Sequence, residues 1–414
     1  MKNFLVHNDN VKKEMLESIG MTTIEDLFSQ IPKEARMSTL DLPSALSELE
    51  TQKSVKKLAS KNNVDYVSFL GGGVYNKFIP ACISQIAQRF EFLTAYTPYQ
   101  AEISQGTLQI MYEFQSMISR LTGMDISNAT VYDGGTACAE AILMARRISK
   151  KSKALVANSL NPEYKKVIDT YAWSNDIEIK YFDVLPSDTA EYACVLVQTP
   201  DYYGEILDVK PVDTLLVVCT DISTLSILKP PSEFGADIVV GDIQTLGIPQ
   251  EFGGPHAGFI SCREKYMRQL PGRLAGRTVD KDGNQAFCLT IQTREQHIKR
   301  EKATSNICSN QALIALCATV YLSLMGEKGF SQAGYLSSKQ AHLLAQKLNA
   351  KGIKTLNKNF FNEFVMEVAD AQKTLDKLKS NGILGGIKLD SQRILVATTE
   401  MISDEDINNY VCNV

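Results

Sequence analysis

Short, nearly continuous apolar runs alternate with helical patterns over much of the chain. Seven such runs lie at residues 129–132, 154–157, 179–182, 194–197, 215–218, 238–240 and 258–260. Between several of them, apolar residues recur at helical spacing, as in residues 108–121 and 137–148. Buried strands separated by helices are typical of a parallel sheet covered on both faces. The pattern therefore predicts an α/β fold with a seven-stranded, mostly parallel sheet.

The pattern changes at both ends of the chain and divides it into three parts. Residues 1–62 read as a helical arm, with a capping-box sequence at residues 22–25 and Pro43 at the first position of a second helix. Residues 63–325 form the predicted large domain. Residues 326–414 form a smaller α/β domain, with a helix at 338–350 and strands near 364–367 and 393–396. The arm either grips a partner subunit or covers the chain's own core.

Composition narrows the class of protein. The chain has 414 residues, 44% hydrophobic and 22% charged, and a net charge of -4, which is ordinary for a globular protein and gives no reason to expect nucleic acid. No apolar run approaches the roughly 18 residues of a membrane span, and the first ten residues do not resemble a signal peptide. Nine cysteines without a C-x-x-C motif and four dispersed histidines indicate reduced thiols and no metal site. We expect a cytoplasmic protein that binds no membrane.

The most informative segment is the run at residues 238–240, which enters a polar turn and a Gly/Pro loop before the run at 258–260. In enzymes that use pyridoxal phosphate (PLP), a strand ending of this kind often presents the lysine that forms the Schiff base. Here Gln244 stands at that place, and an amide cannot form an imine. The chain is therefore either a different type of protein or one half of such an enzyme.

Three further segments carry possible chemistry. The DGGT turn at residues 133–136 precedes a helix and is either an anion site or an ordinary capped turn. The loop at 93–106 is dense in polar groups and is either a ligand loop or a packed helix connection. The basic stretch at 263–302 could receive an acidic partner or a carboxylate substrate, although such a run is more often a solvated face.

Five motifs, in this order, resemble one known family. They are YTPYQAEISQG at 96–106, DGGT at 133–136, GADIVVGDIQTLGIP at 235–249, GGPHAGF at 253–259 and REQHIKREKATSNIC at 294–308. Together they are similar to subunit 1 (alpha) of two-subunit glycine dehydrogenase (decarboxylating), the P-protein of the glycine cleavage system. The likeness covers nearly the whole chain. One departure is Asp201, which stands where the family usually has Asn and puts that local contact in doubt.

The resemblance implies a fold-type-I PLP-dependent transferase fold in a chain that holds no PLP covalently. In the family a homologous beta subunit carries the lysine and binds PLP, and the expected complex is α2β2. Gln244 matches the lysine position. Asp221 falls where a carboxylate would face the pyridine nitrogen, so it is either a relic of that pocket or a strand-end cap.

The resemblance also implies the reaction and its site. Glycine is decarboxylated, and the aminomethyl group passes to the lipoyl group of H-protein. We expect the mouth of a shared active site to be lined by Tyr96, Thr97, Tyr99, Gln100 and Glu102. Arg294, His297 and Lys302 are candidates for the same cleft or for docking the lipoyl carrier. Two alternatives remain, a non-catalytic scaffold for the beta subunit and a stand-alone PLP enzyme that uses another lysine.

Overall fold

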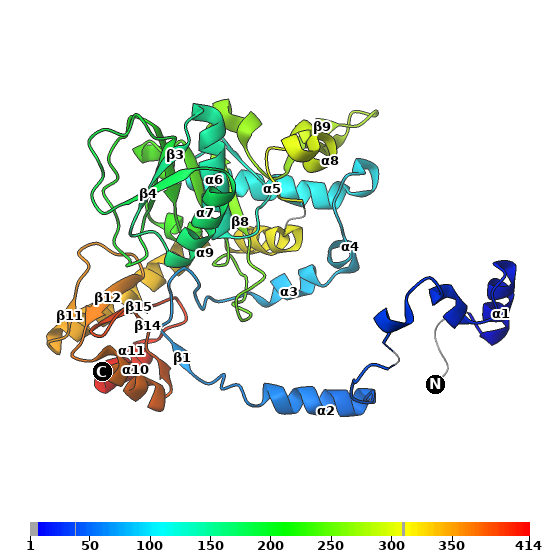
Figure 1. Ribbon diagram of the computed structural model, residues 1–414. Helices are drawn as coiled ribbons and strands as arrows, with labels where there is room; N and C mark the ends of the chain where they lie inside the picture. Colours follow the sequence, from blue (N-terminus) through cyan, green and yellow to red (C-terminus); the bar gives the residue numbers. More distant parts are fainter. Residues whose placement is uncertain (1–6, 38, 309–310) are drawn as a thin grey trace. The chain divides into compact units, whose positions relative to one another are not determined.

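The computed structural model describes residues 7–37, 39–308 and 311–414 (Figure 1). The chain separates into two compact units, Met1–Val64 and Asp65–Val414. The predicted boundary at residue 325, inside the second unit, stays a prediction.

The first unit is helical, as predicted for the arm. It contains α1 (Asp9–Ser18), the 3₁₀ helices η1 (Ile24–Phe28) and η2 (Lys33–Ala35), and α2 (Glu48–Ala59). The capping box lies one residue later than expected, because Thr23 caps η1 and pairs with Asp26. Pro43 does not start the second helix, since Ser47 forms a capping box with Glu50 and sets the start of α2 there. None of the described residues of these helices is buried.

A seven-stranded sheet forms the centre of the second unit, in the order β2 (Ile126–Ser127), β8 (Gly258–Cys262), β7 (Ile238–Asp242), β6 (Leu215–Cys219), β5 (Cys194–Gln198), β3 (Lys153–Ala157) and β4 (Glu178–Phe182). The strands from β7 to β4 are parallel, and β8 runs antiparallel to both of its neighbours. The predicted sheet is therefore confirmed.

The predicted strand at residues 129–132 is wrong. The regular strand β2 ends at Ser127, and only Val131 returns to the sheet, through an isolated bridge to Gly258. Between them the chain bends, because Thr130 has a φ of 151° and the Ala129 amide donates to the carbonyl of Arg273.

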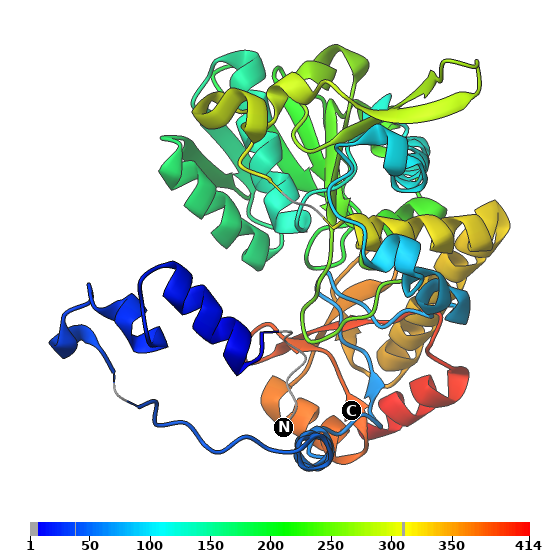
Figure 2. The same ribbon diagram turned by 90° about the vertical axis from the view of Figure 1, so that its right-hand side faces the viewer.

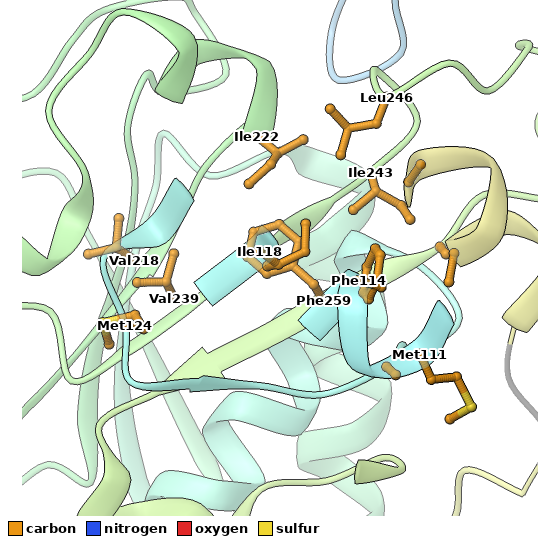
Figure 3. Packing of buried hydrophobic residues seen from close by; sticks show 14 of the residues in the cluster. Met111, Phe114, Ile118, Met124, Val218, Ile222, Val239, Ile243, Leu246 and Phe259 are labelled. Carbon is orange, nitrogen blue, oxygen red and sulfur yellow. The ribbon is translucent and has the colours of Figure 1, made fainter. Parts of the chain in front are cut away.

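Successive residues of the central strands face opposite sides of the sheet. Leu155, Val195 and Val218 pack with α5 (Gln105–Thr122) and the start of α9 (Ala312–Ala350), in the cluster shown in Figure 3. Their neighbours in sequence pack with α6 (Gly134–Ser149) and α7 (Pro162–Ser174) on the other side. Because helices cover both faces of the sheet, the ends of its strands are the places left open for a ligand.

The remaining elements of the second unit are shorter. In sequence, β1 (Val67–Ser68), α3 (Ala81–Ala87), α4 (Phe90–Leu93) and η3 (Ala101–Ile103) precede the strands of the large sheet. After β6 come η4 (Ile222–Ser226) and η5 (Pro231–Phe234), and after β8 comes η6 (Glu264–Gln269). A hairpin of β9 (Leu274–Val279) and β10 (Gln285–Thr290) is followed by η7 (Gln292–Arg294), α8 (Gln296–Lys299) and η8 (Arg300–Lys302).

The C-terminal part has its own sheet, in the order β11 (Lys354–Thr355), β12 (Glu363–Glu367), β15 (Arg393–Ala397) and β14 (Ile387–Lys388). Beside it lie α10 (Ala371–Ser380), α11 (Asp404–Asn413) and β13 (Ile383–Leu384), which pairs with β1. The helix predicted at 338–350 is the C-terminal part of α9, which begins at Ala312 and departs from helical geometry at Gly326. Figure 2 shows α9, in yellow to orange, as two helical segments of different direction.

Helix α9 is the one helix among the described residues that is long and apolar enough to cross a membrane by length and composition. The core helix of a globular protein meets the same test. Ala318 and Tyr321 of α9 are buried against the large sheet, and Leu344 and Leu348 are buried against the C-terminal sheet. Packing of this kind accounts for the apolar composition of the helix.

Candidate functional site

A cavity lies at the carboxyl ends of the parallel strands, where ligands bind in open α/β sheets. Its walls come from the residues that follow β3, β5, β6 and β7, together with the start of β12. The lining residues include Tyr75, Asp201, Asp221, Asp242, Gln244 and Glu363. The chain thus builds a hollow at the place where this fold holds its ligands, and the predicted lysine position is part of its wall.

Gln244 is buried, and its amide is fully hydrogen-bonded inside the chain. Its Oε1 accepts from the Tyr75 amide at 2.9 Å. Its Nε2 donates to the carbonyls of Tyr75 at 3.0 Å and Ile248 at 2.9 Å. A buried amide with all these bonds is a structural clamp that holds two loops together. Gln244 therefore joins loops and has no free group to offer a ligand.

Carboxylates dominate the rest of the cavity. Burial raises the pKa of Asp242 to about 7, that of Glu363 to about 7 and that of Asp201 to about 6. Among the lining residues there is no lysine, arginine or histidine within the part of the chain that the structure describes. An anionic ligand would meet like charge here and no compensating cation.

The DGGT turn does begin a helix, α6, but two of its amides are already occupied. The Asp133 carboxylate accepts from the Thr136 amide at 2.7 Å, and the Asp242 carboxylate accepts from the Gly134 amide at 3.1 Å. The Tyr164 ring covers the turn so closely that a Cβ at Gly134 would lie 2.4 Å from its hydroxyl oxygen. Of the two alternatives, the geometry supports the capped turn.

Asp221 is likewise engaged within the chain. It caps η4 by accepting from the Ser223 amide and hydroxyl, each at 2.9 Å, and it accepts from the Thr245 hydroxyl at 2.9 Å. Asp221 therefore acts as the strand-end cap, one of the two alternatives given for it by the sequence. PLP needs a lysine, a phosphate cradle and a compensating charge. Gln244 is clamped, two amides at the start of α6 are occupied beneath the Tyr164 ring, and the walls are acidic, so this cavity does not fit PLP.

Asp201 keeps the local contact that its replacement of Asn put in doubt. Its Oδ1 accepts from the amides of Tyr203 and Glu205, each at 2.9 Å. An Asn oxygen makes the same two bonds, so the substitution preserves this turn. What it changes is the charge of the cavity wall.

The predicted loop residues lie outside this cavity, on the surface of the second unit. Tyr96 is 82% exposed, and Gln100 and Glu102 are also exposed. Tyr96 and Thr97 line a mostly apolar groove together with Pro255 and Leu313. Four of the five predicted residues are thus exposed and Thr97 is half-buried, and none of them lines the cavity that contains Gln244.

The structure does bring two predicted segments together. The Tyr99 ring lies 4.8 Å from the His297 ring, centroid to centroid, and the Arg273 guanidinium lies 5.6 Å from the Tyr99 centroid. Arg294 is buried nearby, around a second cavity that it shares with Arg273. Lys302 is exposed on η8 and joins neither cavity. The aromatic loop and part of the basic stretch are therefore one surface region.

Several residues of these sites were not predicted from the sequence. Glu363 accepts from the Tyr75 hydroxyl at 2.9 Å and the Gly72 amide at 2.6 Å, across almost three hundred residues of chain. Its signal was a charged residue at the head of an apolar strand. Asp242 was signalled by its place two residues before Gln244. Arg273 was visible only as one of many cations in a basic run.

Comparison with known proteins identifies the family. The family model for the glycine cleavage system P-protein matches residues 2–413. The chain is 45% identical to a probable glycine dehydrogenase (decarboxylating) subunit 1 of Carboxydothermus hydrogenoformans, covering 98% of this chain and 97% of that protein. It is 43% identical to the protein of the same name in Geobacillus thermodenitrificans, over 99% and 97%.

Solved structures agree. A crystal structure of glycine decarboxylase (P-protein) of the glycine cleavage system matches with a TM-score of 0.92 at 37% identity, over 100% of this chain and 99% of that chain. Glutamate decarboxylase of Lactobacillus brevis, at 11% identity and a TM-score of 0.66 over 94% and 97%, shows the shared fold alone. The architecture is the fold-type-I PLP enzyme fold. The chain belongs to the glycine cleavage system P-protein family, in which it matches the subunit 1 chains over nearly its full length.

Proposed function

We propose that this chain is the lysine-free subunit of a two-subunit glycine dehydrogenase (decarboxylating). With a homologous, lysine-bearing beta subunit it decarboxylates glycine, and the aminomethyl group passes to the lipoyl arm of H-protein. The observation that carries the proposal is the clamped Gln244, whose three hydrogen bonds hold Tyr75 and Ile248 at the place of the lysine. A family member built this way needs a second chain to supply the lysine.

In this proposal PLP is bound mainly by the partner subunit. The acidic walls around Asp242 and Glu363, together with the filled start of α6, support that partition, because they oppose a phosphate in this chain's own cavity. The name "subunit 1" of the relatives also implies a partner chain in those proteins. We propose an α2β2 complex that works in the cytoplasm, where thiols such as the nine free cysteines of this chain stay reduced.

The contribution of this chain to catalysis is proposed to be its exposed loop. Tyr96, Thr97, Tyr99, Gln100 and Glu102 offer hydroxyl, amide and carboxylate groups, and none of them lines the cavity that contains Gln244. Across an interface they would orient glycine and help to exclude water from the partner's cofactor. Arg294 and His297 lie beside this loop, which supports a role for the neighbouring basic surface in receiving the lipoyl carrier.

The test is reconstitution with each component omitted in turn. The chain is produced alone and together with the beta subunit, and carbon dioxide release from labelled glycine is measured with lipoylated H-protein. We expect activity only when both subunits are present, and no aldimine absorption band from this chain alone with PLP. An aldimine band that borohydride bleaches in the isolated chain would instead support the stand-alone enzyme.

Substitutions in the loop separate catalysis from scaffolding. Tyr96→Phe and Glu102→Gln should each lower decarboxylation at least about tenfold, which corresponds to about 1.4 kcal/mol of lost transition-state stabilisation. Glu327→Gln, at an exposed site on α9, is the matched control and should have no effect. If both loop variants assemble normally and remain fully active, the chain is a scaffold and the catalytic proposal is wrong.

A further inference from the structure

A second cavity lies between the start of β9 and the segment that precedes α9. It is small and opens to the solvent. Its polar walls come from Arg273, Arg294, Glu295, Thr304 and Ser305. The walls therefore combine two guanidinium groups with one carboxylate in a space suited to a small ligand.

Arg294 is only 8% exposed, yet part of its guanidinium has no partner. Its Nε donates to the Ile291 carbonyl at 3.1 Å and one Nη to the Gly272 carbonyl at 3.0 Å. Within the described ranges its other terminal nitrogen makes no hydrogen bond, and no carboxylate lies within 4.0 Å of the group. A buried guanidinium is a fork of donors that suits a carboxylate.

Glu295 has the complementary deficit. Its side chain is 14% exposed, and its Oε1 is buried without a hydrogen-bond partner among the described residues. Its Oε2 lies 3.8 Å from the Arg273 Nε and 3.7 Å from the His297 Nδ1, which is longer than a hydrogen bond. A buried carboxylate in this state is costly unless something donates to it.

We propose that this cavity binds a small α-amino acid in its zwitterionic form. The ligand carboxylate meets the open donors of Arg294, and the ligand ammonium meets Glu295. A simple monoanion would pair with Arg294 but would leave Glu295 without a donor. The small volume favours the smallest amino acid, glycine. The inference goes beyond the proposed function, because it assigns an amino-acid site to this chain itself, apart from the cofactor of the partner.

The site also has a route to the aromatic loop. Arg273 lines the cavity, and its guanidinium lies 5.6 Å from the centroid of the Tyr99 ring. The His297 ring, whose Nδ1 lies 3.7 Å from Glu295, also contacts Tyr99, with the two ring centroids 4.8 Å apart. A ligand bound to Arg294 and Glu295 therefore lies next to Arg273 and His297, the two residues that contact Tyr99.

The test measures binding to the full chain by isothermal titration calorimetry, with folding checked by circular dichroism. Glycine should bind saturably, and acetate and methylammonium, which each carry one of its charges, should bind at least about tenfold more weakly. Arg294→Lys and Glu295→Gln should each weaken glycine binding by at least about tenfold. Arg277→Lys, at an exposed position of β9, is the matched control and should bind as the wild type does.

The proposal is overturned if glycine shows no saturable binding to the folded chain, or if acetate binds as tightly as glycine. It is also overturned if Glu295→Gln, the milder of the two changes, folds and binds glycine with unchanged affinity. Binding to the isolated chain requires no catalysis. If the reconstituted complex does not decarboxylate glycine but the isolated chain still binds it, the proposed function is wrong and this inference still holds.

Discussion

The Tyr99 ring lies against the His297 imidazole, with the centroids 4.8 Å apart and the planes inclined by 57°. This contact joins the aromatic loop to the basic stretch. Tilted aromatic pairs contribute about 0.5–1.5 kcal/mol beyond their buried area. A double-mutant cycle with Tyr99→Leu and His297→Leu, followed by urea unfolding of the chain, should give a coupling energy in that range. Tyr96→Leu is the control, because Tyr96 has no ring contact among the described residues, and it should show no coupling to His297.

Gln244→Lys restores the type of residue that forms a Schiff base but should not restore cofactor binding. The amides of Gly134 and Thr136 remain occupied by Asp242 and Asp133, and the cavity remains acidic. We expect no aldimine absorption band when this variant is titrated with PLP, and no incorporation of cofactor after borohydride reduction. A bleachable band at stoichiometric PLP would show that the missing lysine alone accounts for the loss of the site.

The buried carboxylates should make the chain less stable as the pH rises. Burial raises the pKa of Glu363 to about 7 and that of Asp242 to about 7, so the folded chain holds these protons more tightly than the unfolded chain. The free energy of unfolding should therefore fall between about pH 4 and pH 7 and level off above that.

Glu363→Gln tests this dependence. The amide keeps an acceptor for the Gly72 amide and can donate to the Tyr75 hydroxyl, so its bonds survive without the charge. We expect the variant to be more stable than the wild type at pH 8 by up to about 3 kcal/mol, at about 1.4 kcal/mol per pKa unit, with little difference at pH 4. Chemical unfolding at both pH values measures it. If the difference in unfolding free energy between variant and wild type is the same at pH 4 and pH 8, ionisation of Glu363 does not destabilise the chain and the prediction is wrong.

Lys77 and Glu400 form a buried ion pair, with Nζ and Oε2 3.1 Å apart and the Lys77 side chain 3% exposed. The Ser337 hydroxyl also donates to the same Glu400 oxygen at 3.0 Å. Lys77→Met should destabilise the chain by about 3–5 kcal/mol, because it leaves a buried carboxylate without its cation. Lys166→Met removes the exposed pair with Glu163 and should cost less than about 1 kcal/mol. Equal losses in thermal or urea unfolding would contradict this account of burial.

Much of the fold could be predicted from the sequence, because its strands are buried on both faces. Runs such as residues 215–218 are apolar throughout, and this pattern survives any error of one residue at a boundary. Residues 129–132 also contain residue types that favour strands, but they do not form the strand. Their course depends on Thr130 and on a bond to Arg273, which lies far away in the sequence. The helix predicted at 338–350 is only the C-terminal part of α9, which begins at Ala312.

The site was less predictable than the fold. The importance of Gln244 followed from its place after a strand, which is a local property. The role of Glu363 depends on the approach of β12 to Tyr75, and no local pattern encodes that distance. The same holds for Arg273 and Arg294, whose burial separates them from the exposed cations of the same stretch. Where a residue lies after folding, more than its type, decides whether it is part of a site.

Helix α9 contributes to two hydrophobic cores at once. Tyr321 lies in the core of the large sheet and Leu344 in the core of the C-terminal sheet, and one helix connects them across Gly326. Loss of either core exposes part of the helix on which the other depends. The two sheets of residues 65–414 are therefore coupled in denaturation. They should melt in a single cooperative transition, so damage to the C-terminal sheet reduces the lifetime of the cavity that contains Gln244.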